Sequence, residues 1–182
     1  MLYRLDTVID DKTLDELINV INSLTPFETF TLYIKGEGGE TAVSHAIINI
    51  LSDLRLTNNV VLVGYEMMCS AHFNIFFETL CSEKILLSDT KGMCHKPFWN
   101  IRVSENAQIK NDLFEHFKKA VMEECTTFTD LTKVIKFTKQ ELKELRNNRD
   151  IYILPSRMKE MLEYNKTKRI CKSLEITLPC TM

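Results

Sequence analysis

The sequence predicts an α/β fold, and three observations lead to it. Strand-like segments rich in β-branched and aromatic residues alternate with segments whose apolar residues recur at helical spacing. One strand-like segment, residues 60–63, is continuously apolar, as is typical of strands buried on both faces of a parallel sheet. Neither an internal repeat nor a Pro/Gly/Ser-rich linker divides the 182 residues, so we expect a single domain over residues 1–182.

The first half of the chain holds most of this alternation. A helix-entry signal at residues 10–13 opens one amphipathic helix, which Pro26 is expected to end. Residues 41–54 form a second amphipathic pattern, and residues 71–80 are apolar on nearly all sides, which indicates a buried helix. The strands between and before these helices are expected at residues 5–8, 29–34 and 59–65.

The second half begins with a strand-like run over residues 83–95, which is most strand-like at 84–87. A helix is predicted to start after Thr138 and to run to about Asn147, because Glu141 completes the capping-box pattern. The remaining expected elements are strands at 98–103 and 174–178, a long helix at 106–125 and a short helix at 158–164.

Three polar side chains follow these elements in an order that predicts catalysis. Ser70 stands where an apolar strand turns into an apolar helix, and a helix N-terminus offers free N–H groups that can hold an oxyanion. His95 ends the next strand-like run and can act as the base that a weak hydroxyl nucleophile needs. Asp150 can supply the carboxylate that orients the imidazole, which completes a Ser-His-Asp set of candidate catalytic residues.

A glycine-rich turn lies upstream of the candidate nucleophile. Gly36, Gly38 and Gly39 are three of the five glycines in the chain, and they directly follow the strand at residues 29–34. Their clustering indicates a backbone geometry that other residues disfavour.

The order of these motifs resembles the proteolytic subunit of the Clp protease family. In that family a strand ends in a Gly-Gly turn, a serine starts a buried helix, and a His-x-Pro motif follows, as His95-Lys96-Pro97 does here. Residues 149–156 are similar to the family's Arg-Asp segment, which carries the catalytic aspartate and then a hydroxyl residue that starts a helix, here Ser156. The resemblance extends from about residue 9 to about residue 168.

The resemblance implies a crotonase-like α/β core of ββα units and the activity of a serine endopeptidase. Backbone N–H groups of Gly39 and Ala71 would form the oxyanion hole. An extended polypeptide substrate would add alongside the segment after His95, with Gly38, Phe98, Trp99 and Asn100 as binding residues.

The resemblance also implies an assembly. Residues of about 98–136 would form the family's protruding handle region, whose long helix would expose apolar side chains in an isolated subunit. In the family, one heptameric ring stacks on another and encloses the active sites. We therefore expect a homo-oligomer, with an AAA+ unfoldase as a candidate partner.

Composition and charge argue against several other classes of protein. The net charge of −2 comes without a basic block, which gives no support to nucleic-acid binding. The first residues lack the apolar run of a signal peptide and no apolar run is long enough to span a membrane, so we expect a cytoplasmic protein. The six cysteines lack a CxxC pair or a zinc-ligand spacing, so we expect reduced, mostly buried thiols, no metal and no cofactor.

Three departures from the family pattern keep other interpretations open. His72 is bulky where the family has a small residue, Glu37 replaces the proline of the Pro-Gly-Gly turn, and Phe98-Trp99 replaces a glycine-rich stretch. A catalytically silent ring subunit is one alternative. An acyl-CoA hydratase of the same superfold is a second, and a Ser–Lys peptidase that uses Lys91 or Lys96 is a third.

Overall fold

The fold is built on a six-stranded, mostly parallel sheet. The computed structural model describes residues 1–96 and 131–175, with side chains to residue 167. The strands follow the order β1-β2-β3-β5-β6, and β4 also pairs with β3. All pairings are parallel except that of β5 with β6. The strand bounds are β1 Leu2–Leu5, β2 Thr29–Gly36, β3 Asn59–Cys69, β4 Glu83–Leu86, β5 Lys91–Cys94 and β6 Ile151–Ile153.

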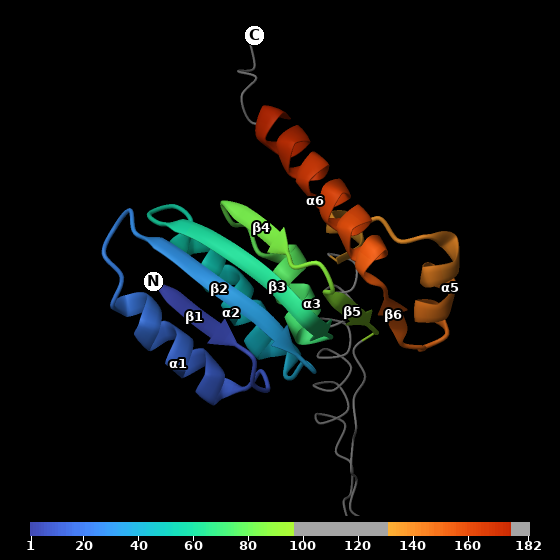
Figure 1. Ribbon diagram of the computed structural model, residues 1–182, viewed down its shortest axis with the longest axis horizontal. Helices are drawn as coiled ribbons and strands as arrows, with labels where there is room; N and C mark the ends of the chain where they lie inside the picture. The colour runs from blue at the N-terminus through green and yellow to red at the C-terminus, as the bar shows by residue number, and fades with distance from the viewer. Residues whose placement is uncertain (97–130, 176–182) are drawn as a thin grey trace, which may run out of the picture.

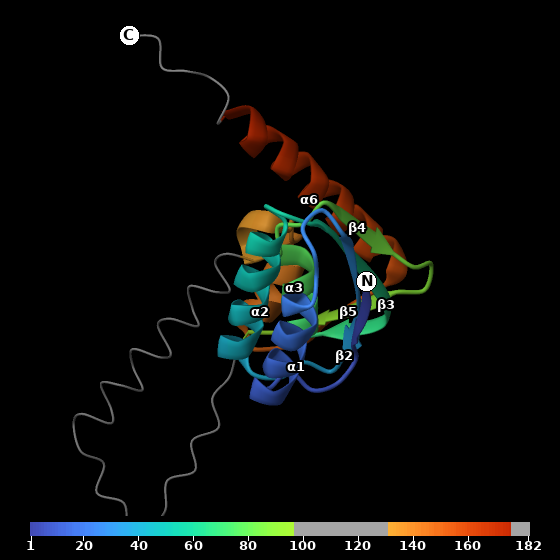
Figure 2. The ribbon, with the colours of Figure 1, turned by 90° about the vertical axis from the view of Figure 1, so that its left-hand side faces the viewer.

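Helices cover the sheet unevenly. Figures 1 and 2 show α1, α2 and α3 together on one face of the sheet, while α6 packs beside β4 and β5 and its C-terminal part projects away. No helix in the described part of the chain is long and apolar enough to cross a membrane. The helix bounds are α1 Asp11–Asn22, α2 Thr41–Leu54, α3 Ala71–Glu78, α5 Lys139–Arg146 and α6 Pro155–Glu175.

The core lies between the sheet and these helices, and α3 is its most buried helix. Phe73, Phe76 and Phe77 of α3 have no exposed surface. The ring centroids of Phe73 and Phe77 are 4.7 Å apart, and those of Phe76 and Phe77 are 5.1 Å apart. Burial of each such side chain contributes about 2–3 kcal/mol, so α3 is anchored firmly and holds its N-terminus in place.

A polar network fastens the other end of α3. The buried Lys84 donates from Nζ to the carbonyl of Phe77 at 2.6 Å and to Oδ1 of Asn165 at 3.3 Å. Asn165 in α6 donates to the same carbonyl at 3.2 Å and to the carbonyl of Val134 at 3.1 Å. A cation beside the last carbonyls of a helix is favourable, so this network joins α3, β4 and α6.

An irregularity in β3 directs the chain toward the site. Ile34 of β2 pairs with Gly64, but Gly36 pairs with Met68, so β3 carries a bulge between its two halves. Glu66 lies in that bulge with a positive φ of 51°. The first half of β3 pairs with β4 and the second half with β5, and β3 therefore ends beside β5 at Cys69.

Most of the expected elements are confirmed. Helix α2 and strand β2 begin at the predicted residues, and β3 and α3 flank Ser70 as expected. The capping box of α5 is present: Thr138 Oγ1 accepts from the N–H of Glu141 at 3.1 Å, and the Glu141 carboxylate accepts from the N–H of Thr138 at 2.6 Å.

The predicted bounds near the N-terminus were partly wrong. The first strand is Leu2–Leu5, not residues 5–8, because residues after Leu5 turn into the cap of α1. Thr13 Oγ1 donates to the carbonyl of Val8 at 2.7 Å, which holds this turn. Helix α1 ends at Asn22, before Pro26, because the N–H of Ser23 closes the last turn onto the carbonyl of Val20 at 3.1 Å.

The structure also differs from the expected elements in the second half of the chain. The run at 83–95 contains two strands, since Thr90 closes a turn with Leu87 and donates its hydroxyl to the carbonyl of Gly64 at 2.9 Å. Strand β6 was missed because it has only three residues. Helix α6 begins at Pro155, a favoured first helical position, and extends to Glu175, so a strand beginning at residue 174 was wrong. Residues 98–103 and 106–125 lie outside the described part of the chain.

Candidate active site

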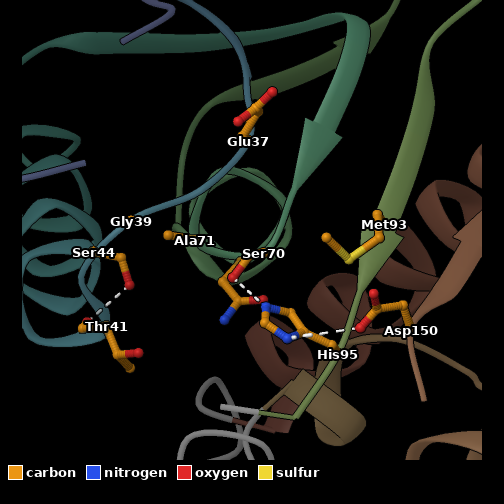
Figure 3. Close-up of a pocket in the computed structure, with 10 residues that line it drawn as sticks. Glu37, Gly39, Thr41, Ser44, Ser70, Ala71, Met93, His95 and Asp150 are labelled. Carbon is orange, nitrogen blue, oxygen red and sulfur yellow. Dashed lines mark hydrogen bonds and ion pairs between the residues drawn. The ribbon is translucent and has the colours of Figure 1, made fainter. Parts of the chain in front are cut away.

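Ser70 occupies a strained turn between β3 and α3. Its backbone has φ 51° and ψ −116°, a conformation that residues other than glycine seldom adopt. The N–H of Ser70 donates to the carbonyl of Met93 in β5 at 2.9 Å, which holds the turn. Its side chain makes no cap hydrogen bond to α3, so the hydroxyl is directed into the site (Figure 3).

His95 faces Ser70 because β3 and β5 run in parallel and end together. Cys69 pairs with Met93 in this ladder, so Ser70, one residue further on, and His95, two residues further on, emerge at the same edge of the sheet. His95 Nε2 lies 2.7 Å from Ser70 Oγ, within hydrogen-bonding distance. The His95 side chain is only 16% exposed, so most of the imidazole is shielded from water.

Asp150 reaches His95 through the antiparallel pairing of β5 with β6. Cys94 pairs with Ile151, so the residue after Cys94 lies opposite the residue before Ile151. His95 Nδ1 and Asp150 Oδ1 are 3.9 Å apart, which is an ion-pair distance and longer than a hydrogen bond. The Asp150 side chain is 50% exposed. The structure therefore brings all three candidate catalytic residues together, with the serine–histidine contact the closer of the two.

The two candidate oxyanion donors lie beside Ser70. Ala71 is the first residue of α3, so its N–H has no acceptor within the helix. Gly39 bridges to Ile9 through the carbonyl of Gly38 and the N–H of Glu40. Groups alternate in direction along an extended strand, so the N–H of Gly39 points away from Ile9. Both residues line the pocket that contains Ser70 (Figure 3).

Two glycines allow close contacts of the turn after β2, one with Ile9 and one with Ser70. Gly39 has φ 153°, and a Cβ there would clash with the carbonyl oxygen of Ile9. Gly38 has φ 118°, and a Cβ there would lie 2.7 Å from Cβ of Ser70 and 3.2 Å from its Oγ. Gly38 therefore packs against Ser70 itself and is not among the residues that line the pocket.

Gly38→Ala is expected to slow the reaction of Ser70 with a covalent serine probe by about 100-fold, because the new methyl group displaces the hydroxyl. The positive φ adds about 1–3 kcal/mol of strain, which a urea unfolding curve measures. Glu40→Ala is the control, because it introduces an alanine into the same turn at an exposed position. Labelling of Gly38→Ala at the wild-type rate would contradict the role given to this contact.

The pocket beside Ser70 has a volume of about 420 Å³. Glu66, Lys91 and Lys96 are not among its described lining residues, which disfavours a Ser–Lys pair. Phe98, Trp99 and Asn100 lie outside the described residues. The lining residues are Glu37, Gly39, Thr41, Ser44, Ser70, Ala71, Asn74, Met93, His95 and Asp150.

Sequence reasoning gave no site role to five of these lining residues: Glu37, Thr41, Ser44, Asn74 and Met93. Asn74 had a usable signal, because it follows Ser70 by one helical turn and so shares its face of α3. Thr41 and Ser44 lie in the first turn of α2, and only the packing of α2 against α3 brings that turn to Ser70.

The cysteines next to the site are poor nucleophiles. Cys69 and Cys94 are buried and unpaired, and burial raises the pKa of both thiols, that of Cys94 to about 12. Both therefore remain protonated at neutral pH, which leaves Ser70 as the candidate nucleophile. Within residues 1–96 and 131–175, no group of three or more His, Cys, Asp or Glu side chains could hold a metal ion.

One comparison with known proteins identifies a family for this chain. The family model for Clp protease matches residues 4–161, which is most of the chain. A comparison with curated proteins finds no match. Because the match covers more than half of the chain, it leads to one conclusion. The chain belongs to the Clp protease family, a family of peptidases.

Proposed function

We propose that this protein is a serine endopeptidase that cleaves unfolded polypeptides with Ser70 as its nucleophile. The observation that carries the proposal is the distance of 2.7 Å between Ser70 Oγ and His95 Nε2 in a largely shielded site. A hydroxyl becomes a useful nucleophile only when a base can take its proton as it attacks, and neutral imidazole is such a base.

The proposed reaction has two halves. Ser70 Oγ attacks the peptide carbonyl carbon while His95 Nε2 takes the hydroxyl proton, and the carbonyl oxygen becomes an oxyanion near the N–H groups of Gly39 and Ala71. The imidazolium then gives its proton to the leaving amine, which departs and leaves an acyl group on Ser70. A water molecule, deprotonated by His95, hydrolyses this ester and restores the free serine. Asp150 stabilises the imidazolium in both halves.

The proposal includes the architecture that the family implies. We propose one peptidase unit over the whole chain, with a handle region at about residues 98–136, that assembles as a homo-oligomeric ring in the cytoplasm. The Clp protease family match supports oligomeric assembly in general. A heptameric ring and an AAA+ unfoldase partner are parts of the same proposal, as is substrate binding along Phe98, Trp99 and Asn100.

A second candidate is a catalytically silent ring subunit. The observation that favours it is the distance of 3.9 Å between His95 Nδ1 and Asp150 Oδ1, with Asp150 half exposed. A weakly held imidazole would activate Ser70 less well than a firmly held one.

Covalent labelling distinguishes the two candidates. We expect incubation with a fluorophosphonate probe to add one adduct to the full-length oligomer, detected as an intact-mass increase, and we expect Ser70→Ala to remain unmodified. The probe reacts only with an activated serine, so one adduct on wild type alone supports the peptidase. Failure to label wild type, with an AAA+ unfoldase also supplied, would reject the peptidase in favour of the silent subunit.

A further inference from the structure

The glycine turn, residues 36–39, carries one of the two proposed oxyanion donors and has little conformational preference of its own. Gly36, Gly38 and Gly39 all have positive φ angles. Glycine gives up more backbone freedom on folding than any other residue, so a turn of this composition does not fix its own shape. The position of the Gly39 N–H therefore depends on the residues that pack against the turn.

The two ends of the glycine turn are tied to different segments of the chain. The N–H of Ile9 donates to the carbonyl of Gly38 at 3.0 Å, and the N–H of Glu40 donates to the carbonyl of Ile9 at 2.8 Å. At the other end of the turn, Gly36 pairs with Met68 of β3. The shape of the turn therefore depends on how the segment after β1 is spaced from the end of β2.

The imidazole of His72 contacts both of these segments. A Cβ on Gly36 would lie 2.7 Å from its Nε2 and 3.0 Å from its Nδ1, so the ring takes the space of a side chain at position 36. Burial lowers the pKa of His72 to about 4, and the Thr7 backbone, two residues before Ile9, is close enough to oppose this shift. The side chain has no exposed surface, so it cannot leave this place without opening a cavity.

His72 also belongs to the helix that carries the second donor. It lies in the first turn of α3, directly after Ala71 and two residues after Ser70. A helical turn is rigid, so the imidazole and the Ala71 N–H keep a fixed relation to each other. At neutral pH the ring is uncharged and packs against the glycine backbone without needing an acid beside it.

We propose that His72 is a positioning residue whose imidazole sets the distance between the glycine turn and α3, and so directs the N–H groups of Gly39 and Ala71 toward one oxyanion. The inference rests on the proposed peptidase activity and adds a residue that acts through the shape of its ring. Oxyanion donors stabilise the transition state only from positions near the developing charge, so a small displacement of the turn slows the reaction.

Steady-state hydrolysis of a fluorogenic peptide by the full-length protein at neutral pH tests this role. We expect His72→Ala to lower kcat about tenfold and to leave KM within about twofold, because the displaced donors serve the transition state rather than the bound substrate. His72→Leu keeps most of the volume and should recover kcat to within about threefold of wild type. A urea unfolding curve checks that each variant is folded in the assay.

A peptide boronic acid gives a second measurement that a loss of stability alone does not change. Its boron accepts the serine oxygen and becomes a tetrahedral anion, with an oxygen near the place where the oxyanion forms. The affinity of His72→Ala for this compound should fall by the same factor of about ten as kcat. If His72→Ala does not fold, His72→Val takes its place, with an expected loss of about threefold in both quantities.

Phe30→Leu is the matched control for a cavity in the core. Phe30 is fully buried near the start of β2, at the opposite end of that strand from Gly36. We expect this variant to unfold at a lower urea concentration but to keep kcat and boronate affinity within about twofold of wild type. The inference fails if Phe30→Leu lowers kcat as much as His72→Ala does, or if His72→Leu is as slow as His72→Ala.

Fluorophosphonate labelling of wild type separates this inference from the proposed function. If wild-type Ser70 is labelled but His72→Ala keeps the wild-type kcat and boronate affinity, or raises KM instead of lowering kcat, the inference is overturned and the peptidase stands. If wild type is neither labelled nor active on the peptide, the peptidase itself is rejected together with the inference.

Discussion

His95→Ala is expected to slow peptide hydrolysis and fluorophosphonate labelling of Ser70 by about 10³-fold, because the serine loses its only base within hydrogen-bonding distance among the described residues. The contact at 2.7 Å sits in a site where the imidazole is 16% exposed, so water cannot easily replace it. Both rates are measured on the full-length protein, beside a urea unfolding curve that checks the fold.

Asp150→Asn should have a much smaller effect, of about tenfold. Its carboxylate is 3.9 Å from His95 and half exposed, and ion pairs of this kind are worth about 1 kcal/mol or less. The two variants therefore rank the members of the triad by their contribution, which a single knockout cannot do. A loss of 10³-fold in Asp150→Asn would mean that the His95–Asp150 contact shortens when substrate binds.

His45→Ala is the matched control for the loss of an imidazole. His45 lies on α2 and does not line the pocket, so its removal should leave both rates within about twofold of wild type. If His95→Ala and His45→Ala behave alike, His95 is not the base and the silent subunit becomes the better account.

The elements that carry Ser70 could be predicted because their signals are local. The continuous apolar run of β3, the glycine turn after β2 and the apolar helix α3 each identify themselves within about ten residues. The meeting of Ser70 with His95 follows from two parallel strands that end at one edge. No local pattern predicted that pairing; the expectation that the two residues meet came from their chemistry and from the resemblance to a known family.

The rest of the site depends on contacts between distant segments. Asp150 reaches His95 only because the three-residue strand β6 pairs with β5, and so short a strand has no readable period. The split of residues 83–95 into two strands depends on the Thr90 hydroxyl, which bonds to a carbonyl of β3. Ser44 joins the pocket through the placement of α2 against α3, which no local pattern of residues encodes.

His72, the bulky residue two places after Ser70, leads to the second prediction. It is fully buried in the first turn of α3, and a Cβ on Gly36 would lie 2.5 Å from its Cε1. Within the described residues, neither ring nitrogen makes a hydrogen bond of ordinary geometry. Burial lowers the pKa of His72 to about 4, against weaker opposing effects of the Thr7 backbone and the Asp6 carboxylate.

This shift makes the fold sensitive to acid over a defined range. The unfolded chain takes up the His72 proton below its ordinary pKa of 6.5, while the folded protein resists it until about pH 4. Above pH 6.5 His72 is neutral in both the folded and the unfolded state, so its titration does not change the free energy of folding. As pH falls from 6.5 to 4, folding loses about 1.4 kcal/mol per pH unit from this residue, and roughly 3 kcal/mol in all.

His72→Leu removes the titrating group but keeps an apolar side chain of similar size at the buried position. We expect its free energy of unfolding in urea to fall about 2–3 kcal/mol less than that of wild type between pH 7 and pH 4.5. Other titrating groups contribute equally to both proteins, so the difference between the two pH profiles isolates His72. Parallel profiles would show that burial does not lower the pKa of His72 in the folded protein. Since the ring packs between α3 and the end of β2, diverging profiles would locate this acid sensitivity in the first turn of α3, two residues after Ser70.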